Sequence, residues 1–234
     1  MSSLSALQNP LQRIWLAALM VASALILASA NPAGAATKPE ELVEKAALTV
    51  EKLMVDPNLP ELRRYMERAQ GVLIIPQLVK GGLIIGGEGG SGVLMVKGSD
   101  GSWSSPAFYT LGGASFGLQI GGEMSEVVFT IMNDGAVSAI LDTQFKLGAD
   151  ASVAVGPIGK GVEASTTTNL SDDIYAFSKS VGLFGGGVLE GAAIIKRTNW
   201  NELYYAAGAD PQKILLERKF FNPHADRLRS SLPN

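Results

Sequence analysis

The sequence contains no cysteine, and its 234 residues include a single histidine, His224. Without cysteine the chain can form no disulfide, no zinc–thiolate or iron–sulfur site and no thiol nucleophile. One histidine rules out metal sites built from several imidazoles, and a Ser-His-Asp triad would have to use this one residue. The composition therefore predicts a protein with no metal, no other cofactor and no catalytic residue of these common types.

An excess of positive charge is also missing. The chain has 19 Lys and Arg against 22 Asp and Glu, for a net charge of −3. Domains that bind nucleic acid usually carry a basic excess, because they must neutralise phosphates. We therefore expect no nucleic-acid partner, and any contact with an anionic surface must come from a local group of basic side chains.

Charge is scarcest at the N-terminus, where Arg13 is the only charged residue before Lys38. The apolar run after Arg13, about 14 residues long, is shorter than the ~20 residues that span a bilayer. Small residues follow it, and this order of basic, apolar and small segments is typical of a secretory signal peptide. We expect residues 1–36 to be a signal peptide and the protein to be exported to the periplasm. An uncleaved membrane anchor is the alternative.

Two helices are expected in residues 37–70. Acidic side chains follow Thr37 and Lys38, where the helix dipole favours them, and apolar residues then recur at helical spacing as far as Met54. A second helix is expected from Leu59 to about Ala69. Its apolar side includes Leu62 and Met66, and its basic side carries Arg63, Arg64 and Arg68.

From residue 71 the chain alternates short apolar runs with glycines, and such a density of glycine disfavours helices, at roughly 0.5–1 kcal/mol for each interior glycine. Strands joined by turns are expected instead. The first strand should end at Pro76, residues 145–155 should form one strand, and residues 133–142 should form one short inserted helix capped by Asn133 or Asp134. Another short helix is expected at 211–217.

The fold class that follows is α+β. We expect a curled antiparallel sheet, barrel- or sandwich-like, of about 8–10 short strands with two N-terminal helices. The β-rich core should span residues 71–217, and residues 218–234 should form a frayed C-terminal tail. Residues 83–88 and 118–123 share the pattern apolar, variable, Ile, Gly, Gly, Glu, which two equivalent hairpin edges would explain.

Two short motifs have more ordinary interpretations than catalysis. Gly87–Gly92 fits G-x-G-x-x-G, but a strand pattern follows it instead of the helix that a dinucleotide site requires. Tyr175 and Lys179 have the spacing used by short-chain dehydrogenases, but we expect them on a strand and not on the helix which that chemistry needs.

The acidic residues suggest two further hypotheses with less support. One is a hydrolase with paired carboxylates, and the other is a calcium site, although no EF-hand spacing is present. We expect instead that the acidic residues lie at solvated turns and strand edges. The six are Glu88, Glu123, Asp142, Asp150, Glu163 and Glu190.

Several blocks resemble the SYLF domain family, in the same order, from about residue 40 to 217. They are Gly71–Pro76, Gly82–Gly92, Trp103–Phe108, Gly112–Gly122, Lys146–Ser152, Gly182–Phe184 and Leu189–Gly191. The resemblance implies a non-enzymatic lipid-binding module. Eukaryotic members are associated with phosphoinositide membranes and, in fungi, with actin, whereas bacterial members are typically exported single-domain proteins, which this chain is similar to.

The resemblance also implies a site, because membrane contact in the family is attributed to an N-terminal amphipathic helix with basic neighbours. The matching positions here are Arg63, Arg64, Arg68 and Lys80, with Leu62 and Met66 inserting shallowly into lipid. We expect peripheral binding to an anionic phospholipid membrane of the cell envelope, or, in a stronger version, an acyl chain held between the sheet and the helices. The alternative is an envelope protein-interaction module, scaffold- or actin-regulator-like, that recruits a protein partner by strand addition without a lipid ligand.

Overall fold

The computed structural model describes residues 36–82, 85–116, 121–142, 144–156, 172–179 and 192–234. The expected signal peptide, apart from Ala36, lies outside these ranges, as do the blocks Gly182–Phe184 and Leu189–Gly191. In the ranges given, no helix has the length and apolar character needed to cross a membrane.

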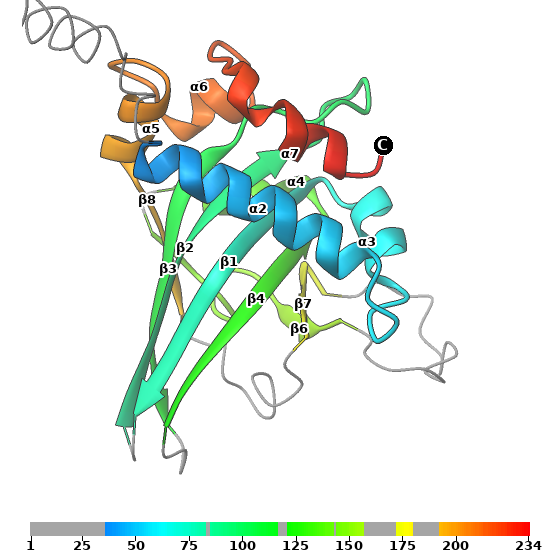
Figure 1. The fold of residues 1–234 in the computed structure, drawn as a ribbon, viewed down its shortest axis with the longest axis vertical. Coiled ribbons are helices and arrows are strands. Elements are labelled where there is room, and N and C mark those ends of the chain that lie inside the picture. Colours follow the sequence, from blue (N-terminus) through cyan, green and yellow to red (C-terminus); the bar gives the residue numbers. More distant parts are fainter. Residues whose placement is uncertain (1–35, 83–84, 117–120, 143, 157–171, 180–191) are drawn as a thin grey trace, which may run out of the picture. The chain divides into compact units, whose positions relative to one another are not determined.

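Within the described residues eight strands form one curled sheet, in the order β5-β8-β3-β2-β1-β4-β7-β6 (Figure 1). Neighbouring strands are antiparallel except for the β6–β7 pair. Their bounds are β1 Gly71–Gly82, β2 Ile85–Val96, β3 Ala107–Phe116, β4 Gly121–Ile131, β5 Gln144–Lys146, β6 Val153–Val155, β7 Ile174–Ser178 and β8 Ala193–Lys196. The expected α+β class with a curled, largely antiparallel sheet is confirmed.

The helices pack around this sheet, and α2 lies across one of its faces (Figure 1). Their bounds are α2 Lys38–Met54, α3 Leu62–Arg68, α4 Asp134–Ile140, α5 Thr198–Tyr204, α6 Pro211–Leu215, the 3-10 helix η2 Pro223–Ala225 and α7 Asp226–Ser231. The inserted helix α4 begins as expected, because the Asn133 side chain accepts a hydrogen bond of 2.8 Å from the Ala136 amide.

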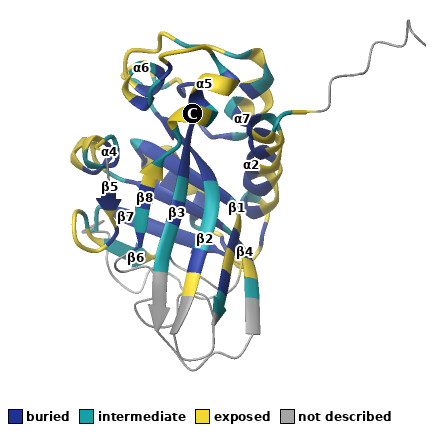
Figure 2. Cartoon of the chain, turned by 90° about the vertical axis from the view of Figure 1, so that its left-hand side faces the viewer, coloured by how far each residue is buried: buried dark blue, intermediate teal, exposed yellow. Residues whose placement is uncertain are grey.

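Each face of the sheet carries its own core, because successive strand residues point to opposite sides. Val72 and Ile74 of β1 pack with α2, α3 and α7, whereas Leu73 and Ile75 pack with α4 and α6 on the other face. In Figure 2 the buried side of α2 accordingly faces the strands and its exposed side faces outward. We call the face opposite α2 the inner face.

Strand β1 does not end at Pro76, which corrects the expectation. It runs on to Gly82 through a bulge, since pairing with β2 shifts between Ile74 and Val79. A proline without an N–H is tolerated at a bulge, where the ladder is already interrupted.

Two glycines of β2 allow this bulge to approach. A Cβ atom at Gly90 would lie 2.6 Å from the Gln77 carbonyl oxygen, and one at Gly92 would lie 2.7 Å from that of Ile74. The G-x-G-x-x-G string is therefore strand, as expected, and its last two glycines serve close packing. Because β1 and β2 are paired on both sides, this block offers no free edge for strand addition.

Two further expectations are wrong. Residues 145–155 form two strands and not one, because a turn with Gly148 at φ 80° and an Asp150 carboxylate bound to the Lys146 amide separates β5 from β6. The C-terminal tail is not frayed. Leu228 and Leu232 are buried, and the Trp103 indole N–H donates to the Pro233 carbonyl oxygen at 2.8 Å.

Candidate functional site

Helix α3 turns its apolar side to the core. Leu62 and Met66 are both fully buried, and the Tyr65 ring packs edge-on against Tyr175 and Phe177, with ring centroids 4.8 and 5.2 Å apart. The expectation that Leu62 and Met66 insert into lipid is therefore wrong in this fold. Their helical spacing was recognised correctly, but the surface that they cover is the sheet and not a bilayer.

The opposite side of α3 is exposed and basic. Arg63 pairs with Glu67 at 3.9 Å and Arg64 with Glu61 at 2.6 Å, while Arg68 makes no ion pair within the described part of the chain. Exposed ion pairs contribute only about 0–1 kcal/mol, so an anionic headgroup can compete for these arginines. We call Arg63, Arg64 and Arg68 the α3 basic face. Its binding role stays a prediction.

The turn that leads from α2 into α3 exposes an apolar side chain. Val55 is 80% exposed, and the next residue fixes the turn, because the Asp56 carboxylate accepts from the Asn58 amide at 3.0 Å and pairs with Lys179 at 3.0 Å. These hydrogen bonds lower the pKa of Asp56. Sequence analysis missed Val55, because a single valine at a helix end carries no periodic signal.

Lys80 does not belong to this surface, which is a second correction. It is only 8% exposed and lies on the inner face, two residues beyond Leu78. Its partners in the sheet are Glu88 of β2 on one side and Glu123 of β4 on the other. The two Gly-Gly-Glu stretches seen in the sequence therefore pair with the same residues of β1, one on each side.

Glu88 is buried at 6% exposure, and neither of its carboxylate oxygens has a hydrogen-bond partner among the described residues. Burial raises the pKa of this carboxyl group, and the nearby Lys80 ammonium opposes the rise in part. Glu88 and Glu123 are separated by strand β1, so the sheet does not bring them together as a catalytic pair.

Among the described residues, no contact joins the remaining acidic candidates either. Asp142 and Asp150 are exposed, the latter within a turn, and Glu163 and Glu190 lie outside the described residues. Nowhere in the described ranges do three or more His, Asp or Glu side chains gather as metal ligands. His224 contacts the Tyr204 hydroxyl and Glu44, both at 3.3 Å, which ties η2 to α2 and α5.

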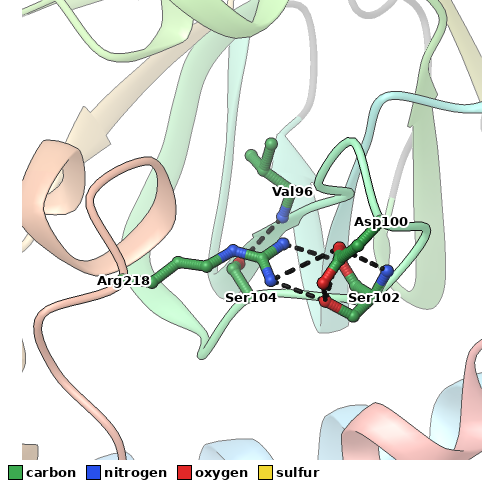
Figure 3. Close-up of polar contacts among 5 residues, drawn as sticks. All are labelled: Val96, Asp100, Ser102, Ser104 and Arg218. Atoms are coloured by element: carbon green, nitrogen blue, oxygen red, sulfur yellow. Dashed lines mark hydrogen bonds and ion pairs between the residues drawn. The ribbon is translucent and has the colours of Figure 1, made fainter.

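A polar cluster at the turn after β2 holds the C-terminal segment in place (Figure 3). The Arg218 guanidinium donates to the Ser102 hydroxyl at 2.6 Å and to the Ser102 carbonyl at 2.7 Å, and it lies 3.7 Å from Asp100. Asp100 in turn accepts from the Ser102 amide at 3.0 Å. These contacts join the turn after β2 to the segment that follows α6, which is a structural role.

Comparison with known proteins shows which family the chain matches. Residues 112–234, more than half of the chain, match the family model Ysc84, described as Las17-binding protein actin regulator. The chain is 36% identical over 166 residues to Protein YSC84 of Saccharomyces cerevisiae, which covers 70% of this chain and 35% of that protein. It is 34% identical over 139 residues to the human SH3 domain-containing YSC84-like protein 1, covering 59% and 40%. The chain thus spans well under half the length of the curated relatives it matches.

Proposed function

The chain belongs to the Ysc84 family, and from that premise we propose that it is a non-enzymatic protein that binds anionic phospholipid membranes through the α3 basic face. The observation that carries the proposal is the position of Arg63, Arg64 and Arg68 on the exposed side of a helix whose other side is fixed to the sheet. Because the helix is already fixed, binding need not order its backbone, and only the arginine side chains lose freedom.

The binding that we propose is electrostatic and peripheral. Leu62 and Met66 are held in the core, so they do not contribute, and Val55 is the exposed apolar side chain available in the adjoining turn. Each basic side chain near an anionic membrane contributes about 1 kcal/mol. Three of them give weak, salt-sensitive attachment, which Val55 reinforces.

Co-sedimentation with vesicles tests this proposal. The protein should pellet with vesicles that contain phosphatidylglycerol and much less with vesicles of phosphatidylcholine alone. The variant Arg63→Glu/Arg64→Glu/Arg68→Glu should pellet no more with the phosphatidylglycerol vesicles than with the phosphatidylcholine vesicles. A control of equal charge change is Lys146→Glu/Lys213→Glu/Lys219→Glu, at positions far from α3 in the sequence. Equal pelleting of both variants would overturn the proposal.

We also propose that the protein acts outside the cytoplasm, after removal of residues 1–36. The support is the order of basic, apolar and small residues at the N-terminus. N-terminal sequencing of the protein recovered from cells of its source organism would test it. A mature N-terminus near Thr37 is the expected result, and an intact Met1 would contradict it.

A further inference from the structure

A pocket of about 280 Å³ opens beside the N-terminal half of α2. One wall is α2 itself, the second is the bulge of β1 together with the neighbouring part of β2, and the third is α5. The polar and aromatic side chains that line it are Lys38, Glu41, Lys45, Gln77, Ser91 and Trp200. The bulge at Pro76–Gln77 therefore shapes a concave surface as well as bending the sheet.

Two of the lining residues are unpaired cations. Lys38 and Lys45 are exposed, lie about two turns apart on one side of α2 and form no ion pair within the described ranges. Glu41, between them on the same helix, offsets one of the two charges. The lining residues of α2 alone thus carry a net charge of about +1.

A third cation, Arg197, does not line the pocket itself but contacts two residues that do. The Arg197 guanidinium donates to the Ser91 hydroxyl at 2.8 Å and stacks on the Trp200 ring, with its central carbon 3.6 Å from the ring centroid. Among the described residues it has no carboxylate partner, and burial lowers its pKa. The guanidinium is only partly buried and has no counter-charge there, so an anion in the pocket would interact with it favourably.

The hydrogen-bonding groups suit the same ligand. Because Ser91 accepts from Arg197 through its oxygen, its O–H remains available to donate into the pocket. The exposed Gln77 amide offers further donors beside it. Trp200, held by the Arg197 stack, gives an apolar surface next to these polar groups.

We propose that this pocket binds the phosphate monoester of a small ligand, with Lys38, Lys45 and Arg197 supplying the positive charge. With Glu41 subtracted, the three cations leave two positive charges, which match the charge of about −1.5 to −2 on a phosphate monoester near pH 7. A carboxylate would leave one cation unmatched. The phosphate can belong to a soluble metabolite or to a lipid headgroup, and the chemistry of recognition is shared.

The pocket is distinct from the α3 basic face. It lies at the N-terminal half of α2, next to α5, whereas α3 follows the other end of this helix (Figure 1). A helix of 17 residues is about 25 Å long. Membrane binding by the arginines and phosphate binding by the pocket therefore succeed or fail separately.

Calorimetric titration of the purified protein with glycerol 3-phosphate, and with inorganic phosphate as competitor, tests the proposal. We expect saturable binding that weakens about tenfold or more in Lys38→Ala/Lys45→Ala, since each charge-assisted contact is worth that much. The control Lys146→Ala/Lys213→Ala should bind like the wild type. If the first variant is unstable, Lys45→Glu alone tests the same claim.

Vesicles separate the two sources of phosphate. Binding to phosphatidic-acid vesicles that depends on Lys38 and Lys45, without binding of glycerol 3-phosphate, assigns the pocket to a lipid headgroup. Binding of glycerol 3-phosphate that persists in Arg63→Glu/Arg64→Glu/Arg68→Glu assigns it to a site independent of the membrane surface. Absence of binding to both probes, or equal binding by Lys38→Ala/Lys45→Ala and the wild type, overturns the inference.

Discussion

Lys80 of β1 lies directly opposite Glu88 of β2, and both side chains are almost completely buried on the inner face of the sheet. The pair is incomplete, because the Glu88 oxygens accept no hydrogen bond from the part of the chain that the structure describes, while Lys80 also faces Glu123 on its other side. A buried carboxylate in this position costs free energy when it is charged. The sheet should therefore respond to pH through Glu88.

The first prediction concerns that response. The pKa of Glu88 is raised above its usual 4.5, so the folded protein holds this proton more tightly than the unfolded chain. The stabilisation is complete below pH 4.5 and is lost as the pH rises through the raised pKa. Glu88→Gln cannot ionise. Its free energy of unfolding in urea should exceed that of the wild type at pH 7 and approach it near pH 4. Glu41→Gln, at an exposed position, is the control, and a Glu88→Gln that is less stable at pH 7 would contradict the prediction.

The second prediction concerns the bulge. Gly90→Ala and Gly92→Ala should each destabilise the protein by about 1–3 kcal/mol, because the new methyl group meets the backbone of β1. Gly87→Ala, in the same strand, is the matched control, since its Cβ would find the nearest atom 3.8 Å away. Urea unfolding measures all three. Similar losses at residues 87 and 90 would show that strand glycines in general, and not the close approach of β1, set the stability.

These glycines illustrate which parts of the fold could be predicted from the sequence. The density of glycine and the alternation of apolar residues were enough to predict strands, and the polar residues Asn133 and Asp134 were enough to place the start of α4 to within one residue. The continuation of β1 through Pro76 was not predictable locally. It depends on pairing with β2 on one side and β4 on the other, which outweighs the missing N–H of a single proline.

The candidate sites, like the fold, could be predicted from the sequence only in part. Helical spacing placed Arg63, Arg64 and Arg68 correctly on one side of α3, but the same spacing fits an apolar side that covers a sheet or one that enters a membrane. The pocket joins Lys45, Ser91 and Trp200, which lie far apart in the sequence. No local pattern connects them, so only the fold could bring them together.

The third prediction tests the docking of the C-terminal segment. Leu228 of α7 is fully buried against the core that includes α2, so Leu228→Ala should cost about 2–5 kcal/mol. Leu203→Ala, at a position 61% exposed on α5, should change stability by less than about 0.5 kcal/mol. Thermal unfolding compares the two. Equal and small effects would mean that residues 226–231 do not pack in solution as they do in the structure.

The last prediction ranks the three arginines of α3. Arg63 and Arg64 each face an acidic neighbour, Glu67 and Glu61, whereas Arg68 forms no ion pair within the part of the chain described. An arginine that must leave a partner gains less from a headgroup than one that has none. Arg68→Ala should therefore weaken vesicle binding more than Arg63→Ala or Arg64→Ala does.

Salt provides the second readout for this ranking. Attraction between exposed charges is screened within about 10 Å at 0.1 M salt, so vesicle binding of the wild type should fall steeply as salt is added. Arg68→Ala should make this dependence shallower, because one fewer charge contributes. Glu67→Ala, which frees Arg63, should instead strengthen binding to phosphatidylglycerol vesicles at low salt. Weaker binding by Glu67→Ala would contradict the argument, since it would mean that the ion pair orients Arg63 and does not compete for it.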